Sequence, residues 1–249
     1  MRPLIAGNWK MNGLAAQLAE IEAVSVSVKA SPPSADILIC LPATLIQRAG
    51  QTAAGRIEIG GENCHAEIEG AFTGDISAEM LRDAGASAVI VGHSERRQHH
   101  GETDPIVAAK AKAAGRAGLL AIICVGETKS QRLDGKALSV CGLQIAASVP
   151  ESVTSSAIAI GYEPLWAIGT GHTPTSAEIV EIHAHIRQCL MARFGTEGRM
   201  VRILYGGSVN PTNAPGILAL PQVGGALVGG ESLKANDFEA IFRSVPTIT

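Results

Sequence analysis

Along the chain, short apolar runs alternate with longer segments in which apolar and polar residues are interspersed. Eight apolar runs recur, at residues 4–9, 37–41, 57–61, 88–92, 119–125, 157–161, 201–205 and 222–228. Runs of this length with little polar alternation are typical of parallel strands covered on both faces. The pattern therefore predicts eight buried strands.

The segments between these runs carry apolar residues three and four positions apart, as Ile179, Ile182, Ile186 and Leu190 do. This spacing places the apolar side chains on one face of a helix. We predict helical segments at residues 14–29, 43–50, 77–83, 102–115, 130–148, 176–194, 211–218 and 232–244. Eight strand–helix units in 249 residues have the number and size of the α/β fold known as the (β/α)8 barrel. We expect a single domain with eight parallel strands over residues 1–249.

An open, doubly wound sheet is the alternative fold. Such a sheet usually carries a G-x-G-x-x-G turn directly after its first strand. Here the first run ends at Asn8 and Trp9 and continues through Lys10 to Gly13 without that turn. The barrel is therefore the better prediction.

Composition narrows the class of partner. The net charge is −3, the pI is near 6.2, and the Lys and Arg residues are scattered. Nucleic-acid and membrane-surface proteins usually show a clustered basic patch instead. We expect a small-molecule partner, with no nucleic acid and no membrane.

The cysteines and the N-terminal segment indicate a compartment. The five cysteines have no CxxC spacing, and Cys40 and Cys124 lie in apolar runs. The first residues form neither a signal-peptide core nor a span of about 20 apolar residues. We therefore expect reduced thiols in a cytoplasmic protein.

In a (β/α)8 barrel the active site lies at the carboxyl ends of the strands. Glu163 follows the run at 157–161, and Pro164 and the glycines Gly169 and Gly171 come after it. Proline stiffens one end of this segment and glycines free the other, which is typical of a lid beside a catalytic acid. An ordinary surface glutamate before a flexible connection is the alternative.

Two other strand ends carry candidate chemistry. Alternation along the first strand places Asn8 and Lys10 on one side and Trp9 on the other, so Lys10 faces the barrel mouth if Trp9 packs outward. His93 begins what we predict to be a short helix, whose positive end favours a neutral imidazole that can donate a hydrogen bond. The alternatives are a lysine that extends into solvent and a structural histidine.

Two Gly-Gly pairs, Gly206-Gly207 and Gly229-Gly230, follow the last two strands. Glycines before a helix let backbone N–H groups approach an anion, and loops seven and eight form a common phosphate site in barrels. The sequence therefore predicts a phosphorylated substrate. Tight turns alone explain either pair, but less easily both.

Metal and nucleophile chemistry find little support. His183 and His185 are two residues apart on a predicted helix, and no H-E-x-x-H pattern or cysteine cluster is present in the sequence. Ser208 lacks a G-x-S-x-G turn, and Cys124 fits an apolar structural role better. We expect no metal and no cofactor.

Taken together, these motifs resemble the triosephosphate isomerase family over nearly the whole chain. The similarity rests on residues 7–12, 70–74, 92–97, 162–171, 205–209 and 228–230, in that order. The resemblance implies a TIM barrel and an aldose–ketose isomerase, an intramolecular oxidoreductase without a cofactor. It would interconvert dihydroxyacetone phosphate and D-glyceraldehyde 3-phosphate through an enediol or enediolate, in glycolysis and gluconeogenesis.

The resemblance also implies roles for individual residues. Glu163 would move the proton, His93 would act at the two substrate oxygens, and Lys10 and Asn8 would stabilise and position the intermediate. The phosphate would be held by backbone N–H groups of Gly169, Ser208, Gly229 and Gly230.

By the same resemblance the lid closes over the substrate and brings Ile168 against Glu163, opposite Leu227. The lid residues are Pro164, Leu165, Trp166, Ala167, Ile168, Gly169, Thr170, Gly171, His172, Thr173 and Pro174. The second hinge, His172-Thr173-Pro174, departs from the more common family sequence Lys-Thr-Ala.

Finally, the resemblance implies a homodimer in which Thr73 reaches the active site of the second subunit. Glu62 and Asp75 stand near this loop where the family commonly has Gln and Glu.

The alternative functions are a metal-dependent sugar-phosphate epimerase, an aldolase and a catalytically silent barrel. The metal ligands that the epimerase needs and the Schiff-base lysine that the aldolase needs are not evident in the sequence.

Overall fold

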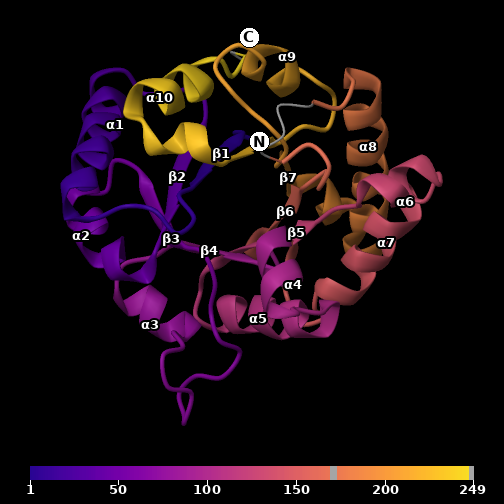
Figure 1. Ribbon diagram of the computed structural model, residues 1–249, viewed down its shortest axis with the longest axis horizontal. Helices are drawn as coiled ribbons and strands as arrows, with labels where there is room; N and C mark the ends of the chain where they lie inside the picture. Colours follow the sequence, from indigo (N-terminus) through magenta and orange to yellow (C-terminus); the bar gives the residue numbers. More distant parts are fainter. Residues whose placement is uncertain (169–172, 247–249) are drawn as a thin grey trace.

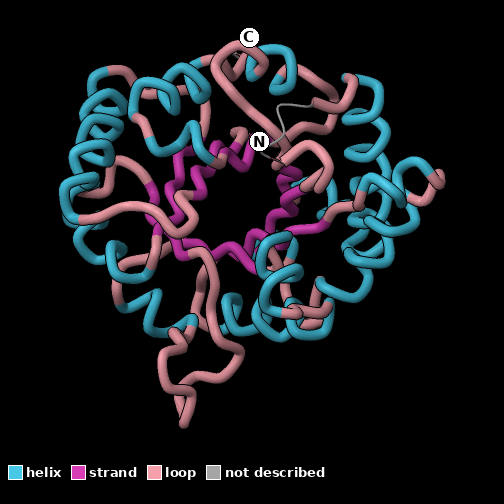
Figure 2. Tube along the Cα trace, viewed as in Figure 1, coloured by secondary structure: helices cyan, strands magenta, loops and turns pink. Residues whose placement is uncertain are grey.

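The structure, a computed structural model, describes residues 1–168 and 173–246. Its centre is a closed barrel in which each strand pairs in parallel with the next and the last strand pairs with the first (Figure 2). The strands are β1 (Leu4–Asn8), β2 (Asp36–Leu41), β3 (Glu58–Gly61), β4 (Ala88–Val91), β5 (Leu120–Val125), β6 (Ile158–Tyr162), β7 (Arg202–Tyr205) and β8 (Gly225–Val228). The predicted (β/α)8 fold is confirmed.

Side chains alternate between two apolar layers along each strand. In β1, Leu4 and Ala6 belong to the cluster inside the barrel, whereas Ile5 belongs to the cluster between strands and helices. Both layers exclude water, which explains why the strands read as continuous apolar runs. The interior is therefore filled, and the polar residues that follow the strands are left for the barrel mouth.

The helices form a ring outside the strands (Figure 1). They are α1 (Leu18–Ala30), α2 (Ala43–Ala53), α3 (Ala78–Asp83), α4 (Ser94–His100), α5 (Asp104–Arg116), α6 (Lys129–Leu133), α7 (Ala137–Ser148), α8 (Ser176–Phe194), α9 (Ala214–Leu218) and α10 (Ala235–Arg243). Short 3-10 turns, η1 (Ala15–Gln17), η2 (Ser155–Ala157), η3 (Gly195–Met200) and η4 (Gly230–Leu233), complete them. Within the described residues, no helix is long and apolar enough to cross a membrane.

Local capping explains where α8 begins. The Thr175 hydroxyl accepts a hydrogen bond from the N–H of Glu178, and the Glu178 carboxylate accepts one from the N–H of Thr175. This reciprocal pair satisfies N–H groups that have no partner inside the helix. The observed bounds of α8 equal the predicted ones.

Several predicted elements differ from the structure in their bounds, and three of these differences have a clear local cause. The single helix predicted at 130–148 is split into α6 and α7, because Gly135 adopts a φ of +70° between them. The helix predicted at 211–218 starts only at Ala214, since the Asn210 side chain accepts the N–H groups of Thr212 and Asn213 in a turn. The strand predicted from 222 begins at Gly225, after Gln222 turns with a φ of +65°.

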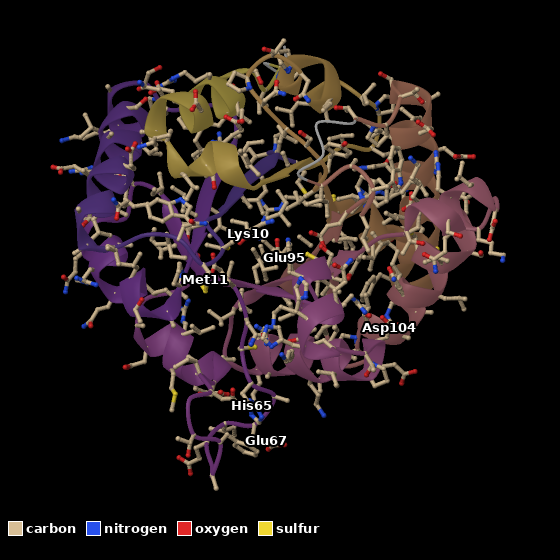
Figure 3. All side chains as sticks on the ribbon, viewed as in Figure 1. Lys10, Met11, His65, Glu67, Glu95 and Asp104 are labelled. Atoms are coloured by element: carbon tan, nitrogen blue, oxygen red, sulfur yellow. The ribbon has the colours of Figure 1, made fainter. Side chains whose placement is uncertain are left out.

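A loop between β3 and α3 projects from the barrel, at the bottom of Figures 1 and 2. His65 and Glu67, labelled in Figure 3, lie on it. Its apolar side chains Ile68, Phe72 and Ile76 are 51%, 43% and 37% exposed. We call residues 64–76 the projecting loop.

Candidate active site

A cavity of about 250 Å³ opens at the carboxyl ends of the strands. It collects most of the residues predicted from the sequence, although they lie far apart along the chain. The predicted residues that line it are Asn8, Lys10, His93, Glu163, Ile168, Ser208, Leu227, Gly229 and Gly230.

The end of β1 places Lys10 in this cavity. Trp9 is buried between β1 and the helices, and its indole N–H donates a hydrogen bond to the Ser232 carbonyl at 2.9 Å. Lys10 follows with a φ of 56°, a conformation that side-chain-bearing residues rarely adopt. The predicted outward packing of Trp9 is confirmed, and it turns Lys10 toward the mouth.

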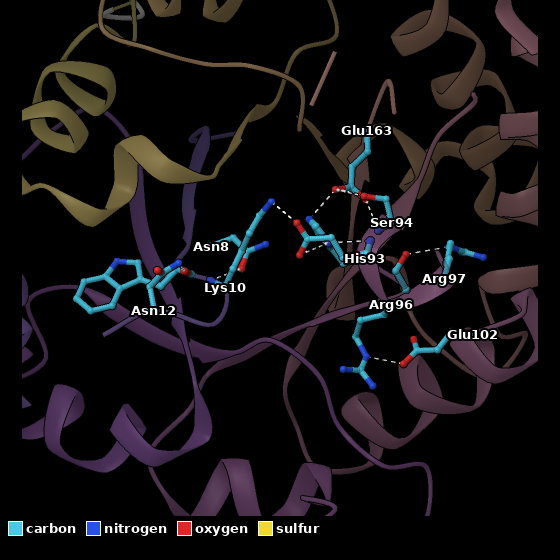
Figure 4. A network of polar contacts seen from close by, with 12 residues as sticks. Asn8, Lys10, Asn12, His93, Ser94, Arg96, Arg97, Glu102 and Glu163 are labelled. Carbon is cyan, nitrogen blue, oxygen red and sulfur yellow. Dashed lines mark hydrogen bonds and ion pairs between the residues drawn. The ribbon is translucent and has the colours of Figure 1, made fainter. Parts of the chain in front are cut away.

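The ammonium group of Lys10 pairs with a carboxylate that the sequence reasoning missed. Its Nζ lies 2.5 Å from Oε1 of Glu95, in the first turn of α4 (Figures 3 and 4). Burial raises the pKa of Glu95, but the hydrogen bond and charge of Lys10 outweigh it, so the pKa is lowered overall. Glu95 therefore provides a negative charge beside Lys10.

His93 caps the N-terminus of α4, the predicted short helix. Its Nδ1 accepts a hydrogen bond from the N–H of Glu95 at 3.3 Å, and its Nε2 lies 2.8 Å from Oε1 of Glu163 (Figure 4). An Nδ1 that accepts carries no proton, so the Nε2 proton points at Glu163 in this arrangement. The ring thus presents a donor to the cavity.

The electrostatics of His93 differ from the prediction. Burial lowers its pKa, but the charge of Glu163 and the hydrogen bond to it raise the pKa above its ordinary value. The sequence argument for a neutral ring considered the helix N-terminus and not this facing carboxylate, which acts in the opposite direction. The upward shift depends on Glu163 remaining beside the ring.

Glu163 itself is only 2% exposed and lies just beyond β6. Its Oε2 accepts a hydrogen bond from the backbone N–H of Ser94 at 2.9 Å, and the Ser94 hydroxyl lies 3.4 Å from Oε1. Ser94 is a second residue that sequence reasoning missed, although its motif was recognised. These contacts hold the carboxylate at one wall of the cavity.

Glycine turns after β7 and β8 form another part of the cavity wall. A Cβ on Gly207 would lie 2.3 Å from the Tyr205 hydroxyl, so only glycine fits that turn. Gly229 precedes η4, and a Cβ there would meet nothing nearer than Cε of Lys10 at 4.0 Å. The backbone at this wall is therefore uncovered and close to a cation.

Part of the lid is described. Leu165, Trp166, Ala167 and Ile168 form a turn in which the N–H of Ala167 donates to the Pro164 carbonyl at 2.8 Å. The Trp166 indole N–H donates to the buried carboxylate of Glu127 at 3.0 Å, a third contact missed from the sequence. At the other end, Thr173 is exposed and Pro174 is buried. The predicted lid residues Gly169, Thr170, Gly171 and His172 lie outside the described residues.

Thr73 does not line this cavity. It is exposed on the projecting loop, in the part of the chain that the sequence analysis assigned to a subunit contact. Within this chain, the loop and the cavity are separate features.

The comparisons with known proteins match this geometry. A family model described as triosephosphate isomerase matches residues 3–245. The chain belongs to the triosephosphate isomerase family. A triosephosphate isomerase of Hyphomonas neptunium is 60% identical over 97% of this chain and 98% of its own length. One of Rhodopseudomonas palustris is 57% identical over 99% and 98%.

Among solved structures, triosephosphate isomerase from Bartonella henselae superposes with a TM-score of 0.92 at 49% identity, covering 98% of this chain and 99% of that one. The resemblance seen in the sequence is therefore confirmed. As a member of this family, the chain is an aldose–ketose isomerase that interconverts dihydroxyacetone phosphate and D-glyceraldehyde 3-phosphate, a step of glycolysis and gluconeogenesis.

Proposed function

We propose that Glu163 is the base that carries the proton between the two carbons of the triose phosphate. The observation that carries this proposal is its nearly complete burial in a cavity that His93 and Lys10 also line. Its carboxylate removes a proton from one carbon, which leaves an enediolate, and returns the proton to the neighbouring carbon, while the hydroxyl proton of the substrate passes from one oxygen to the other at His93. To reach a substrate carbon, the carboxylate has to leave the N–H of Ser94.

His93 acts at the substrate oxygens. Its Nε2 proton points at Glu163 in the present arrangement. When Glu163 moves to the substrate, the same proton is left facing the cavity, where it donates to a carbonyl or enediolate oxygen. Without the facing carboxylate the upward pKa contribution is also lost, which favours the neutral ring as donor.

Lys10 supplies the positive charge that stabilises the enediolate, and Asn8 helps position the substrate oxygens. Lys10 N–H donates to Oδ1 of Asn8 at 3.2 Å, so the two residues form one local unit. The unusual backbone of Lys10 fixes the direction of its side chain before substrate arrives, and preorganised charge of this kind stabilises a transition state.

The phosphate is held by backbone N–H groups of Ser208, Gly229 and Gly230, which line the same cavity as Glu163. Uncovered glycine backbone lets a phosphate oxygen approach the chain directly. Gly169, which lies outside the described residues, is expected to add a further N–H from the lid. Ile168 of the lid and Leu227 of β8 form the apolar cover over Glu163. Exclusion of water by this cover strengthens the electrostatic contacts in the cavity.

A coupled assay for glyceraldehyde 3-phosphate production from dihydroxyacetone phosphate tests this mechanism. The expected result is high turnover without added metal and unchanged turnover in excess chelator. A metal-dependent epimerase would lose its activity in chelator, a Schiff-base aldolase would not form this product from dihydroxyacetone phosphate alone, and a silent barrel would have no activity. Glu163→Gln assayed beside the parent identifies the base.

We further propose a homodimer in which Thr73 of the projecting loop enters a second subunit. The exposed apolar residues Ile68 and Phe72 support this, as does a groove of about 790 Å³ beside the active site. The groove is lined partly by Lys10 and Glu95, so a loop seated there would complete the catalytic site. Sedimentation that shows a fully active monomer at assay concentration would contradict this proposal.

We also propose a cytoplasmic location. The five cysteines are all unpaired, and burial holds the pKa of Cys40 and Cys124 above the ordinary value for a thiol. Such thiols suit a reducing compartment. Activity recovered in the periplasmic or membrane fraction of the source cells would contradict this location.

A further inference from the structure

Strand β5 neighbours β6, the strand after which Glu163 lies. The chain continues beyond the end of β5 and supports the backbone of Glu163. The N–H of Glu163 donates to the Val125 carbonyl at 2.8 Å, and the N–H of Leu165 donates to the Glu127 carbonyl at 3.1 Å. Residues 125–127 and 163–165 therefore run side by side beyond the formal ends of β5 and β6. Glu163 and the lid residue Leu165 are both hydrogen-bonded to this extension of β5.

Gly126 is the point of closest approach. A Cβ built on Gly126 would lie 1.7 Å from the backbone carbonyl oxygen of Glu163 and 2.9 Å from Cδ1 of Leu165. No real side chain tolerates the first distance, so the absence of a Cβ lets the two segments touch. Any shift of Gly126 is consequently transmitted to the backbone of Glu163.

The side chain of Gln144 holds Gly126 from the other side. Gln144 lies on α7, which packs against β5 (Figure 1). Its Oε1 accepts a hydrogen bond from the N–H of Gly126 at 2.7 Å, and its Nε2 donates to the carbonyl of Gly126 at 3.2 Å. A primary amide is the side-chain group that matches an N–H and a C=O at once.

We propose that Gln144 is a positioning residue for the isomerase reaction. By binding both polar groups of Gly126, it fixes the backbone on which Glu163 and Leu165 rest, and so fixes where the Glu163 carboxylate reaches. Gln144 itself does not line the catalytic cavity. This inference rests on the proposed role of Glu163 as the base.

Two variants separate positioning from simple attachment of α7 to the barrel. Gln144→Met keeps the length of the side chain and removes both hydrogen bonds. Gln144→Glu keeps an acceptor for the N–H of Gly126 but sets an oxygen against its carbonyl. The matched control is Ile145→Val, which removes one buried methylene from the adjacent position of α7 and leaves Gly126 untouched.

The measurements are the melting temperature, kcat, KM, and the affinities for inorganic phosphate and 2-phosphoglycolate, a phosphate that also carries an enediolate-like carboxylate. Because a catalytic group displaced by about 1 Å can cost up to ~100-fold in rate, we expect Gln144→Met to lower kcat about 10-fold. Affinity for 2-phosphoglycolate falls in parallel, whereas KM and phosphate affinity stay within about twofold, since the phosphate wall is formed by other loops. Gln144→Glu gives a smaller loss in the same direction.

Ile145→Val should lower the melting temperature without changing kcat. The proposal is overturned if Gln144→Met lowers the melting temperature as the control does while kcat and 2-phosphoglycolate affinity stay at parent values. If Gln144→Met does not fold, Gln144→Glu decides by the same criteria. Failure of the base assignment is a different result, because Glu163→Gln would then retain turnover whatever the Gln144 variants do.

Discussion

Strands β5 and β6 lie side by side, and each is followed by a buried glutamate with a different environment. Glu127, after β5, is fully buried, and its Oε1 accepts hydrogen bonds from the Tyr162 hydroxyl at 3.1 Å and the Trp166 indole at 3.0 Å. Glu163, after β6, is 2% exposed and contacts His93 and Ser94. One carboxylate supports the lid, and the other faces the cavity.

A one-residue offset explains this difference. Val125 and Tyr162 are paired in the barrel and both point outward to the helix layer. Glu127 is two residues after Val125 and keeps the outward direction, whereas Glu163 is one residue after Tyr162 and points inward. Strand alternation thus explains which glutamate faces the cavity.

The largest expected effect comes from Glu163→Gln. Loss of a general base typically lowers the reaction rate about 10²–10⁴-fold. We therefore expect kcat to decrease by a factor in that range while the affinity for phosphate is retained. Steady-state kinetics and phosphate titration measure this. A variant with parent turnover would remove Glu163 from the mechanism.

Glu127→Gln should have a smaller effect on catalysis and a larger effect on stability. An amide oxygen is a weaker acceptor for Tyr162 and Trp166, and hydrogen bonds to charged groups contribute roughly 1.5–3 kcal/mol. We expect the free energy of unfolding to decrease by an amount in that range. We expect kcat to decrease far less than in Glu163→Gln. If instead Glu127→Gln showed the greater loss of kcat, the assignment of the two carboxyl groups would be reversed.

Glu62 is a third carboxyl group for comparison: the residue is half-buried, and its buried Oε1 has no hydrogen-bond partner within the described chain. Burial raises its pKa to about 8. At pH values between the ordinary pKa of a glutamate and about 8, the unfolded chain releases this proton more readily than the folded chain does. The free energy of unfolding therefore falls as pH rises through this interval.

Glu62→Gln should therefore remove that decline. We expect the variant to gain roughly 1 kcal/mol of unfolding free energy over the parent at pH 8, since a buried group without a partner costs about that much. At pH 4.5 the gain should be smaller. Urea unfolding at both pH values measures it, and an equal difference at the two would refute the raised pKa.

The smallest effect is expected for Ser94→Ala. The backbone N–H of Ser94 still holds Glu163 at 2.9 Å, and only the long hydroxyl contact of 3.4 Å is lost. A weak hydrogen bond contributes about 0.5 kcal/mol, so kcat should change by about two- to threefold at most. A loss comparable to that of Glu163→Gln would mean that the hydroxyl, not the backbone, holds the carboxylate.

The barrel and the convergence of four candidate residues in one cavity could be predicted from the sequence because both depend on local signals. Apolar runs mark strands, and a barrel brings all their carboxyl ends to one mouth. Asn8, Lys10, His93 and Glu163 each lie at or just after the end of a run, so their convergence required no knowledge of packing. Family resemblance then supplied their roles.

The remaining contacts could not be predicted from the sequence because they join side chains across elements. Nothing local to Glu95 indicates that it pairs with Lys10, and nothing local to Gln144 indicates that it reaches Gly126. The upward influence on the His93 pKa was missed for the same reason, since the charge that causes it comes from Glu163, which is distant in the sequence. The split of the 130–148 helix depended on a positive φ at Gly135, which propensity alone does not fix.

The most direct test of Glu163 as the base is a crystal structure of the protein with 2-phosphoglycolate bound. We expect the Glu163 carboxylate to leave the Ser94 N–H and to lie against the ligand carbons. We expect the Nε2 N–H of His93 to donate a hydrogen bond to a ligand oxygen. Glu127 should keep Tyr162 and Trp166 as partners. A bound ligand with Glu163 still held by Ser94, or with another carboxylate against its carbons, would contradict the assignment of Glu163 as the base.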